Sequence, residues 1–521
     1  MDRYLMTVDA GTGSARAVLF DLQGNEVAIG QREWSHHSEE GVANSMNFDC
    51  QANWQLICEC IQQALSAAGI GPEQVAAISA TSMREGIVLY DADGQELWAV
   101  ANVDARADQQ VRSLKQQFPG IEENFYQQSG QTFALGALPR LLWLKQNQPA
   151  VYDRAQRISM ISDWVLARLS NTIATDPSNA GTTGIFSLAE RQWQPQMATQ
   201  VGLNSTLFPP VVEPGEVIGE ITAVAAKASG LKAGTPVVMG GGDVQLGSAG
   251  LGIVEKGQSA VLGGSFWQQV VNIEANTPPP KDMGIRVNPH VINGLSQAEG
   301  ITFFSGLTMR WFRDAFCGEE VNLAQQRGVD PYQLLEELAE KVPVGSHGIV
   351  PIFSDAMKYG RWYHASPSFL NLSIDAQRCN KASMFRSLQE NACIVSAVNL
   401  EAIASFSGYD SDSIVFAGGA SKGFLWPQIL ADVTGKEVNI PKVREATALG
   451  GAMAAAVGIG LYDSITEAAK DWIRWDKSYQ PTMANYQQYA DIKARWQQLY
   501  QRQLALVDEG LTTSMWAAPG L

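Results

Sequence analysis

A chain of 521 residues exceeds the size at which one hydrophobic core stops growing, so at least two domains are expected. Its 45% hydrophobic and 17% charged residues are typical of a globular protein in water, and a formal net charge of −16 argues against nucleic acid as a partner. No stretch approaches the ~18 apolar residues that cross a membrane, no Cys-x-x-Cys pair occurs, and the N-terminus carries no signal segment. We therefore expect a cytoplasmic protein that binds neither nucleic acid nor membranes.

The first 250 residues alternate apolar strands with turns and helices. Short β-type runs, helical spacing of apolar residues and Gly-containing turns place the elements. The predicted strands are 5–9, 15–21, 26–30, 75–82, 86–91 and 235–243, with a helix over 53–68 that ends at Gly69 and a mostly helical section over 104–169. This order predicts an α/β domain.

The pattern of the N-terminus begins again near residue 259. "SAVLGGSFWQQVVNI" is strand, glycine turn and strand, and in "SIVFAGGASKGFLWPQILADV", from Ser413, a strand leads through glycines into a helix. Such an internal echo predicts two related α/β domains, 1–248 and 249–521, with a cleft between them.

The loop "DAGTGSAR" after the first strand has the composition of a phosphate-binding loop, and three designs compete for it. A P-loop needs Lys where the nearest match, "GIVEKGQS", has Gln258, and a Rossmann loop needs a third glycine where Arg16 stands. The remaining design is a hairpin whose N–H groups and the hydroxyls of Thr12 and Ser14 face a phosphate, with Asp9 near a magnesium ion. A plain β-hairpin without a ligand is the alternative.

Asp243 stands at the end of a predicted strand, after three glycines that let a ligand approach the backbone. A carboxylate in that place suits a general base, and equally the N-cap of the next helix. The residues alone leave both interpretations open.

Six segments, in this order along the chain, carry a family resemblance: "DAGTGSAR", "GGGDVQLG", "VLGGSFW", "FFSGLTMRWFRDAF", "AGGASKGFLWPQILADVTG" and "EATALGGAMAAAVGIG". From about residue 4 to 500 the chain resembles the FGGY carbohydrate kinases. That resemblance implies an α/β fold of two actin-like (ribonuclease H-like) domains with a nucleotide cleft between them, and ATP and Mg²⁺ as the phosphoryl donor and its metal.

The resemblance also implies a role for individual residues. Asp243 matches the catalytic base, and Asp9 matches the aspartate on the metal side. The expected nucleotide contacts are Thr12, Gly13, Ser14, Arg16, Gly264, Ser265, Gly306, Arg310 and Gly419, and the expected substrate contacts are Arg84, Glu85, Asp104 and Gln245. The chain departs from the family at Gly264, where many relatives have Thr, and at Gly423, where some have Asn.

The pair Arg84-Glu85 sets a donor fork beside an acceptor, which suits a small molecule whose hydroxyls both donate and accept. A surface ion pair of little energetic value is the alternative. Five segments set the chain apart from glycerol and xylulose kinases: "MREGIVLY", "NVDAR", "DPSNAGTTG", "WYHASPSFLNLSID" and "GLTTSMWAAPGL". They imply a polyol-like ketone, linear dihydroxy-pentanedione, as acceptor.

Two other functions remain open from the sequence: a kinase for another sugar such as a pentulose, and a non-catalytic ATP switch like the actin and chaperone relatives of the fold. Asp243 and the Arg84-Glu85 pair favour a small acceptor over a switch. The resemblance also allows a homodimer and regulation by a sugar-transport phosphocarrier protein.

Overall fold

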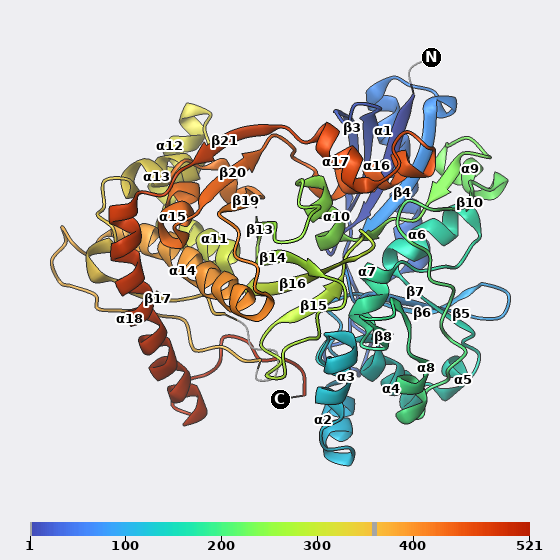
Figure 1. The fold of residues 1–521 in the computed structure, drawn as a ribbon, viewed down its shortest axis with the longest axis horizontal. Helices are drawn as coiled ribbons and strands as arrows, with labels where there is room; N and C mark the ends of the chain where they lie inside the picture. The colour runs from blue at the N-terminus through green and yellow to red at the C-terminus, as the bar shows by residue number, and fades with distance from the viewer. Residues whose placement is uncertain (1–2, 357–361, 521) are drawn as a thin grey trace.

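A computed structural model describes residues 3–356 and 362–520, which form two lobes, each built around a large mixed sheet (Figure 1). The N-terminal sheet has the order β10 (Val217–Glu220), β11 (Pro236–Val238), β4 (Val75–Ser82), β1 (Tyr4–Ala10), β2 (Ser14–Asp21) and β3 (Glu26–Glu33), and β12 (Gly241–Gly242) pairs with β4. The C-terminal sheet has the order β15 (Arg286–Pro289), β16 (Leu295–Thr302), β14 (Trp267–Glu274), β13 (Ser259–Gly263), β19 (Ser413–Ala417), β20 (Glu437–Pro441) and β21 (Trp475–Tyr479).

The two sheets repeat one pattern. From β3 to β10, successive neighbours are antiparallel, antiparallel, parallel, parallel and antiparallel. The series from β16 to β21 is the same. This confirms the expected α/β class with two related domains, and it leaves β15 as a strand that the C-terminal sheet adds at its edge.

Corresponding helices cover the two sheets. α1 (Cys50–Ala68) packs on β2 and β3, and α14 (Lys381–Ser407) packs on β14 and β16. The Asp49 carboxylate caps α1 by accepting from the N–H of Ala52, and Gly69 ends the helix at φ 64°. The predicted helix over 53–68 is therefore confirmed, with its start three residues earlier.

Each half carries further elements, which lie mostly on the faces of its sheet and beyond the edges of the sheet in Figure 1. In the N-terminal half these are β5 (Ile87–Tyr90), β6 (Glu96–Val100), α2 (Asp108–Gln117), α3 (Ile121–Ser129), α4 (Ala137–Asn147), α5 (Pro149–Tyr152), β7 (Arg157–Met160), α6 (Ile161–Ser170), α7 (Pro177–Ala180), β8 (Phe186–Ser187), β9 (Gln192–Trp193), α8 (Pro195–Gln200) and α9 (Ala223–Ser229). In the C-terminal half they are α11 (Ser305–Phe316), α12 (Gly318–Arg327), α13 (Pro331–Ala339), β17 (Val350–Ile352), β18 (Ser368–Leu370), α15 (Leu425–Thr434) and α18 (Met483–Asp508).

Two helices lie where the halves meet: α10 (Asp243–Gly250) and α16 (Ala446–Gly458). α16 follows the last parallel strand of the C-terminal sheet, yet it packs on β1 and β4 and against α10, and α17 (Ile465–Trp472) packs beside it. A Cβ atom on Gly250 would lie 1.9 Å from the Ala446 carbonyl oxygen, and one on Gly450 would lie 2.0 Å from that of Leu246. The small residues of both helices are therefore required by their close crossing.

The chain returns between the halves at its end. After α18, the Ala518 N–H donates to the Trp362 carbonyl at 2.8 Å, and the Gly520 N–H donates to Asp108 of α2 at 2.6 Å. The Trp516 ring lies 4.9 Å from that of Phe303. This tail therefore connects the C-terminal half to the N-terminal half.

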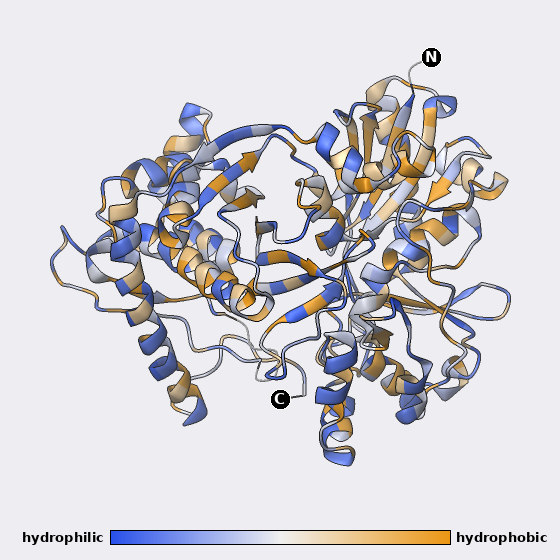
Figure 2. Ribbon diagram, viewed as in Figure 1, coloured by the Kyte–Doolittle hydropathy of each residue, from blue (hydrophilic) through white to orange (hydrophobic). Residues whose placement is uncertain are grey.

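Apolar residues concentrate on the sheet strands, whereas outlying helices such as α2 are mainly hydrophilic (Figure 2). Among residues 3–356 and 362–520, none of the helices combines the length and the apolar character needed to cross a bilayer.

Candidate active site

The predicted phosphate loop is the turn between β1 and β2, so a hairpin is confirmed in place of the strand-to-helix designs. The Gly11 N–H donates to the Ser14 carbonyl at 2.9 Å, and the Trp34 indole N–H donates to the carbonyls of Gly11 and Thr12 at 3.0 and 3.2 Å. The Thr12 hydroxyl accepts from the Asn102 side chain at 3.0 Å. These hydrogen bonds fix the conformation of the turn.

Asp9 and Arg16 flank this loop as directly opposed residues of β1 and β2. Arg16 forms an ion pair of 2.8 Å with Glu445, the residue before α16. Burial, and then the nearby Asp243, raise the pKa of Asp9 to about 7. The site therefore holds a carboxylate whose negative charge is poorly compensated by the residues around it.

Asp243 is the first residue of α10, and Gly242 is the N-cap, so the capping interpretation of Asp243 is wrong. The Gly242 N–H donates to the Ser178 hydroxyl at 2.9 Å, which fixes the turn, and the Val244 N–H donates to Asp243 Oδ1 at 2.8 Å. The Asp243 side chain remains 38% accessible to solvent, yet burial by the surrounding walls raises its pKa to about 6 against the lowering effect of Arg84. A carboxylate with such a pKa is able to accept a proton near neutral pH.

Three of the predicted substrate contacts lie together beside Asp243. Arg84 Nε lies 3.8 Å from Asp243 Oδ1, and Glu299 Oε1 accepts from both Arg84 at 2.6 Å and Gln245 at 2.7 Å. Burial would raise the pKa of Glu85, but its ion pair with Arg286 and the neighbouring Arg84 outweigh burial and hold that pKa below its usual value. A cluster of fixed donors and acceptors therefore borders the carboxylate.

Asp104 is one step removed from this cluster. Its carboxylate is buried and accepts from the Met46 N–H at 2.6 Å and from Arg106 Nε at 2.8 Å. Arg140 donates to the carbonyl oxygens of both Asp104 and Glu85. The geometry gives Asp104 a supporting position behind the cluster, while its contact with a substrate remains a prediction.

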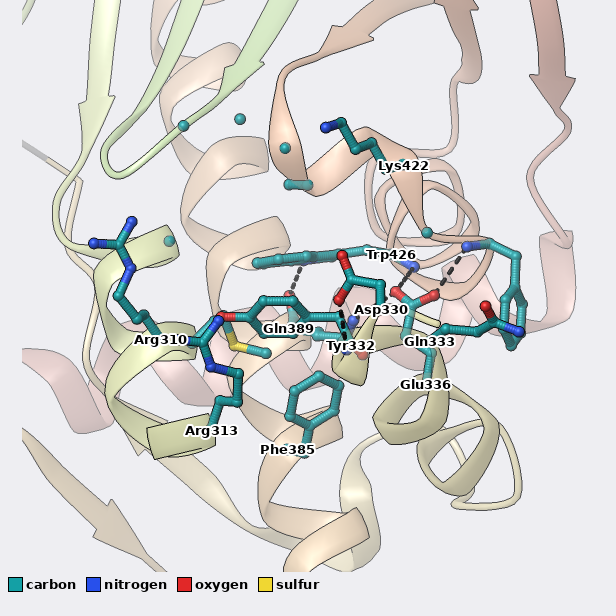
Figure 3. A pocket seen from close by; sticks show the side chains of 18 of the residues that line it. Arg310, Arg313, Asp330, Tyr332, Gln333, Glu336, Phe385, Gln389, Lys422 and Trp426 are labelled. Carbon is teal, nitrogen blue, oxygen red and sulfur yellow. Dashed lines mark hydrogen bonds between the residues drawn. The ribbon is translucent and has the colours of Figure 1, made fainter. Parts of the chain in front are cut away.

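The C-terminal half contains a pocket of about 610 Å³. Its lining includes five residues predicted to contact the nucleotide: Gly264, Ser265, Gly306, Arg310 and Gly419. Figure 3 shows Arg310 and Arg313 on one side of it, and the rings of Tyr332 and Trp426 from α13 and α15. A pocket of this size with aromatic walls and basic side chains suits a nucleotide. The phosphate-loop residues 12–16 belong to the other half and are not part of its lining.

Glu336 is a pocket residue that the sequence did not reveal. Its buried carboxylate accepts from the N–H groups of Phe424, Leu425 and Trp426 at 2.9, 3.3 and 3.4 Å, and so holds the start of α15. A Cβ on Gly423 would lie 2.4 Å from both carboxylate oxygens, so a side chain at this position would require Glu336 to move. The sequence signal was weak, because "LLEELAE" contains three glutamates in a row of seven residues and nothing in it sets Glu336 apart.

Gly264 departs from the family without such a requirement. A Cβ there would meet nothing closer than the Phe266 carbonyl oxygen at 3.5 Å, so the space would accept a side chain.

Glu299 and Arg286 were not among the site residues that the sequence predicted. Glu299 lies in "SQAEGIT", where an acid within an apolar strand is a usable signal of a buried partner. Arg286 offered no comparable signal.

The donor chemistry around Asp9 fits a magnesium ion. The nearby Asp243 carboxylate contributes to the raised pKa of Asp9, so a cation bound here would stabilise the ionised form of Asp9. Within the described ranges no group of three or more His, Cys, Asp or Glu side chains could hold a metal. Mg²⁺ commonly takes one or two carboxylates and completes its shell with water and substrate phosphates.

Two family models match this chain. The N-terminal domain of the FGGY family of carbohydrate kinases matches residues 4–250, and the C-terminal domain of that family matches residues 270–459. The chain belongs to the FGGY family of carbohydrate kinases.

Curated relatives of this FGGY kinase are similar over almost the full chain. It is 56% identical over 519 residues to a protein named autoinducer-2 kinase from Salmonella typhimurium strain LT2, covering 99% of this chain and 98% of the relative. It is 57% identical over 519 residues to the protein of that name from Escherichia coli K12 strain DH10B, with the same coverage.

Solved structures of kinases share the fold. Xylulose kinase from Rhodospirillum rubrum superposes with a TM-score of 0.84 at 22% identity, covering 97% of this chain and 99% of that one. Plasmodium falciparum glycerol kinase with ADP superposes with a TM-score of 0.82 at 17% identity, covering 96% and 98%. At these identities the likeness confirms the two-domain fold.

Proposed function

We propose that this FGGY kinase transfers the γ-phosphoryl group of ATP to autoinducer-2, at the terminal hydroxyl of its linear dihydroxy-pentanedione form. The observation that carries the proposal is the identity of 56–57% over nearly the full chain to proteins named autoinducer-2 kinase. The Arg84, Glu85 and Gln245 cluster beside Asp243 supports a small acceptor that offers both hydroxyl and carbonyl groups.

Asp243 acts in this proposal as the general base. It accepts the proton of the attacking hydroxyl while the new oxygen–phosphorus bond forms and the bond from the γ-phosphorus to the ADP oxygen breaks. Burial raises the pKa of Asp243 to about 6, and the Arg84 guanidinium, 3.8 Å from the carboxylate, limits that rise, so most of Asp243 is ionised at neutral pH.

The other residues bind and orient the donor. We assign the base and ribose of ATP to the pocket lined by Tyr332 and Trp426, and the phosphates to the turns at Gly264 and residues 11–14. Asp9 would hold Mg²⁺ or one of its waters, and the ion would neutralise charge on the phosphate oxygens. Because these groups come from both halves, closure of the halves would assemble the site and exclude water.

A panel of acceptors tests the proposal. ATP consumption is measured with dihydroxy-pentanedione, xylulose, ribulose and glycerol at equal concentration, together with mass spectrometry of the phosphorylated product. We expect the highest kcat/KM for dihydroxy-pentanedione. Faster turnover of a pentulose would overturn the autoinducer-2 assignment and favour the pentulose kinase alternative, whereas the family would be unaffected.

A further inference from the structure

Two charged residues that are adjacent in the N-terminal half contact two charged residues that face each other across a strand pair in the C-terminal half. Arg84 and Glu85 follow β4, and Arg286 of β15 lies directly opposite Glu299 of β16 in the antiparallel register. Arg84 donates to Glu299 at 2.6 Å, and Arg286 forms an ion pair with Glu85. We call these four residues the charge quartet.

Two members of the charge quartet, Arg84 and Glu299, are buried, and the other two, Glu85 and Arg286, are mostly shielded from solvent. The exposed fractions of its side chains are 4% for Arg84, 0% for Glu299, 11% for Arg286 and 14% for Glu85. Removing charges from water costs about as much as such pairs regain, so buried ion pairs are a poor source of stability compared with apolar packing. Their value here is that they hold side chains in a single orientation.

The charge quartet reaches the residues around the proposed base. The Glu299 oxygen that accepts from Arg84 also accepts from Gln245, two residues after Asp243. Glu85 has a left-handed backbone at φ 64°, unusual for a residue with a side chain. Its side chain is held by Arg286 and its carbonyl by Arg140, so contacts from both halves maintain that conformation.

The strand that carries Arg286 is the one that the C-terminal sheet adds to the shared six-strand pattern. β15 lies against α7 of the N-terminal half. Arg286 Nε donates to Gln131 at 2.6 Å, and the Asn288 side chain donates to the Ser178 carbonyl at 2.7 Å. β15 therefore packs against the N-terminal half, which carries Arg84 and Glu85.

We propose that Arg286 and Glu299 are positioning residues through which the C-terminal half orients Arg84 and Glu85 toward the acceptor. This inference rests on the proposed kinase function. It predicts that acceptor recognition depends on two residues of the half that holds the nucleotide pocket, although neither needs to touch the acceptor.

The test compares Arg286→Ala, Arg286→Lys and Glu299→Gln with the unchanged protein. We expect Arg286→Ala to raise KM for dihydroxy-pentanedione by roughly 5- to 150-fold, because Glu85 loses its partner, with KM for ATP within about twofold of the unchanged protein. Arg286→Lys keeps the charge without the planar fork and should restore part of the loss. Glu299→Gln keeps the volume and the hydrogen bonding of the side chain. If Arg286→Ala loses stability, this variant tests in its place whether KM for dihydroxy-pentanedione rises while KM for ATP does not.

Lys470→Ala is the matched control, because it breaks an exposed ion pair with Glu255 near the junction of the halves and away from the charge quartet. It should leave both KM values unchanged. Equal changes in the two KM values, accompanied by a lower melting temperature and no rescue by Arg286→Lys, would overturn the positioning role.

Failure of this inference is distinguishable from failure of the proposed function. If the unchanged protein prefers a pentulose, the variants are measured with that pentulose, and a selective rise in its KM still supports positioning. An unaltered KM for the preferred acceptor in all three variants contradicts the inference, and a protein that phosphorylates no acceptor in the panel contradicts both proposals.

Discussion

The two halves share a strand pattern but carry different chemistry at corresponding points. In the N-terminal sheet, β1 ends beside Asp9, and β4 leads into Arg84 and Glu85. In the C-terminal sheet, β13 ends at Gly263, and β19 leads into two glycines of which Gly418 has φ 97°. Both halves carry a glycine turn after their first sheet strand, but the parallel strand beside it leads into a charged pair in the N-terminal half and into two glycines in the C-terminal half. A shared topology therefore fixes where a site forms, while the residues after each strand decide what it does.

The largest expected effect comes from removing the proposed proton acceptor, Asp243, in the N-terminal half. Asp243→Asn keeps the size and the hydrogen-bonding capacity but loses the base, so kcat should fall about 10²-fold or more. ATP affinity, measured by calorimetry, should remain within a few-fold because the nucleotide pocket lies in the other half. Near-normal turnover would contradict the assignment of Asp243.

Asp9→Asn tests the second charge of the same half. We expect the Mg²⁺ concentration for half-maximal activity to rise roughly 10- to 100-fold, because one anionic oxygen near the proposed ion is lost. Initial rates over a Mg²⁺ series give this value, and KM for the acceptor serves as the internal control. An unchanged Mg²⁺ dependence would remove Asp9 from the metal side.

Gly423→Ala tests whether the nucleotide pocket of the C-terminal half requires a glycine beside Glu336. The new Cβ would press on the Glu336 carboxylate that holds the start of α15, so the free energy of unfolding should fall by about 1–3 kcal/mol. Gly264→Ala is the matched control, since its Cβ meets no atom closer than 3.5 Å. Denaturant unfolding of both variants gives the difference. Equal stability of the two would show that Glu336 yields freely.

The smallest expected effect is on pH dependence. Because the pKa of Asp243 is raised to about 6 and the base acts only when ionised, kcat/KM should rise with pH and level off above about pH 7. One unit below the pKa the value should be about tenfold under its plateau. Saturating Mg²⁺ favours ionised Asp9, whose own pKa is about 7, and leaves Asp243 to set the acidic limb. A flat profile between pH 5 and 8 would contradict the raised pKa.

The sequence by itself determined the local elements and the candidate loops. Apolar runs on both sides of "DAGTGSAR", the second of them strand-like, were sufficient for the hairpin, and the echo at residue 259 was sufficient for two related domains. Asp243 became a candidate because three glycines precede it at a strand end, and the resemblance to the FGGY kinases assigned it as the base. These signals are local, since hydrophobic period and glycine content act within a few residues.

Only the tertiary structure decided which distant residues act together. No local pattern indicates that Glu299 meets Arg84, that Arg286 meets Glu85, or that Glu336 excludes a side chain at Gly423. The physical reason is that the partner of a buried charge is selected by how whole sheets and helices pack, and a sequence read in short windows contains no record of that packing. The packing of α16 on the N-terminal sheet also became apparent only in the tertiary structure, where glycines allow the backbones of α10 and α16 to cross at contact distance.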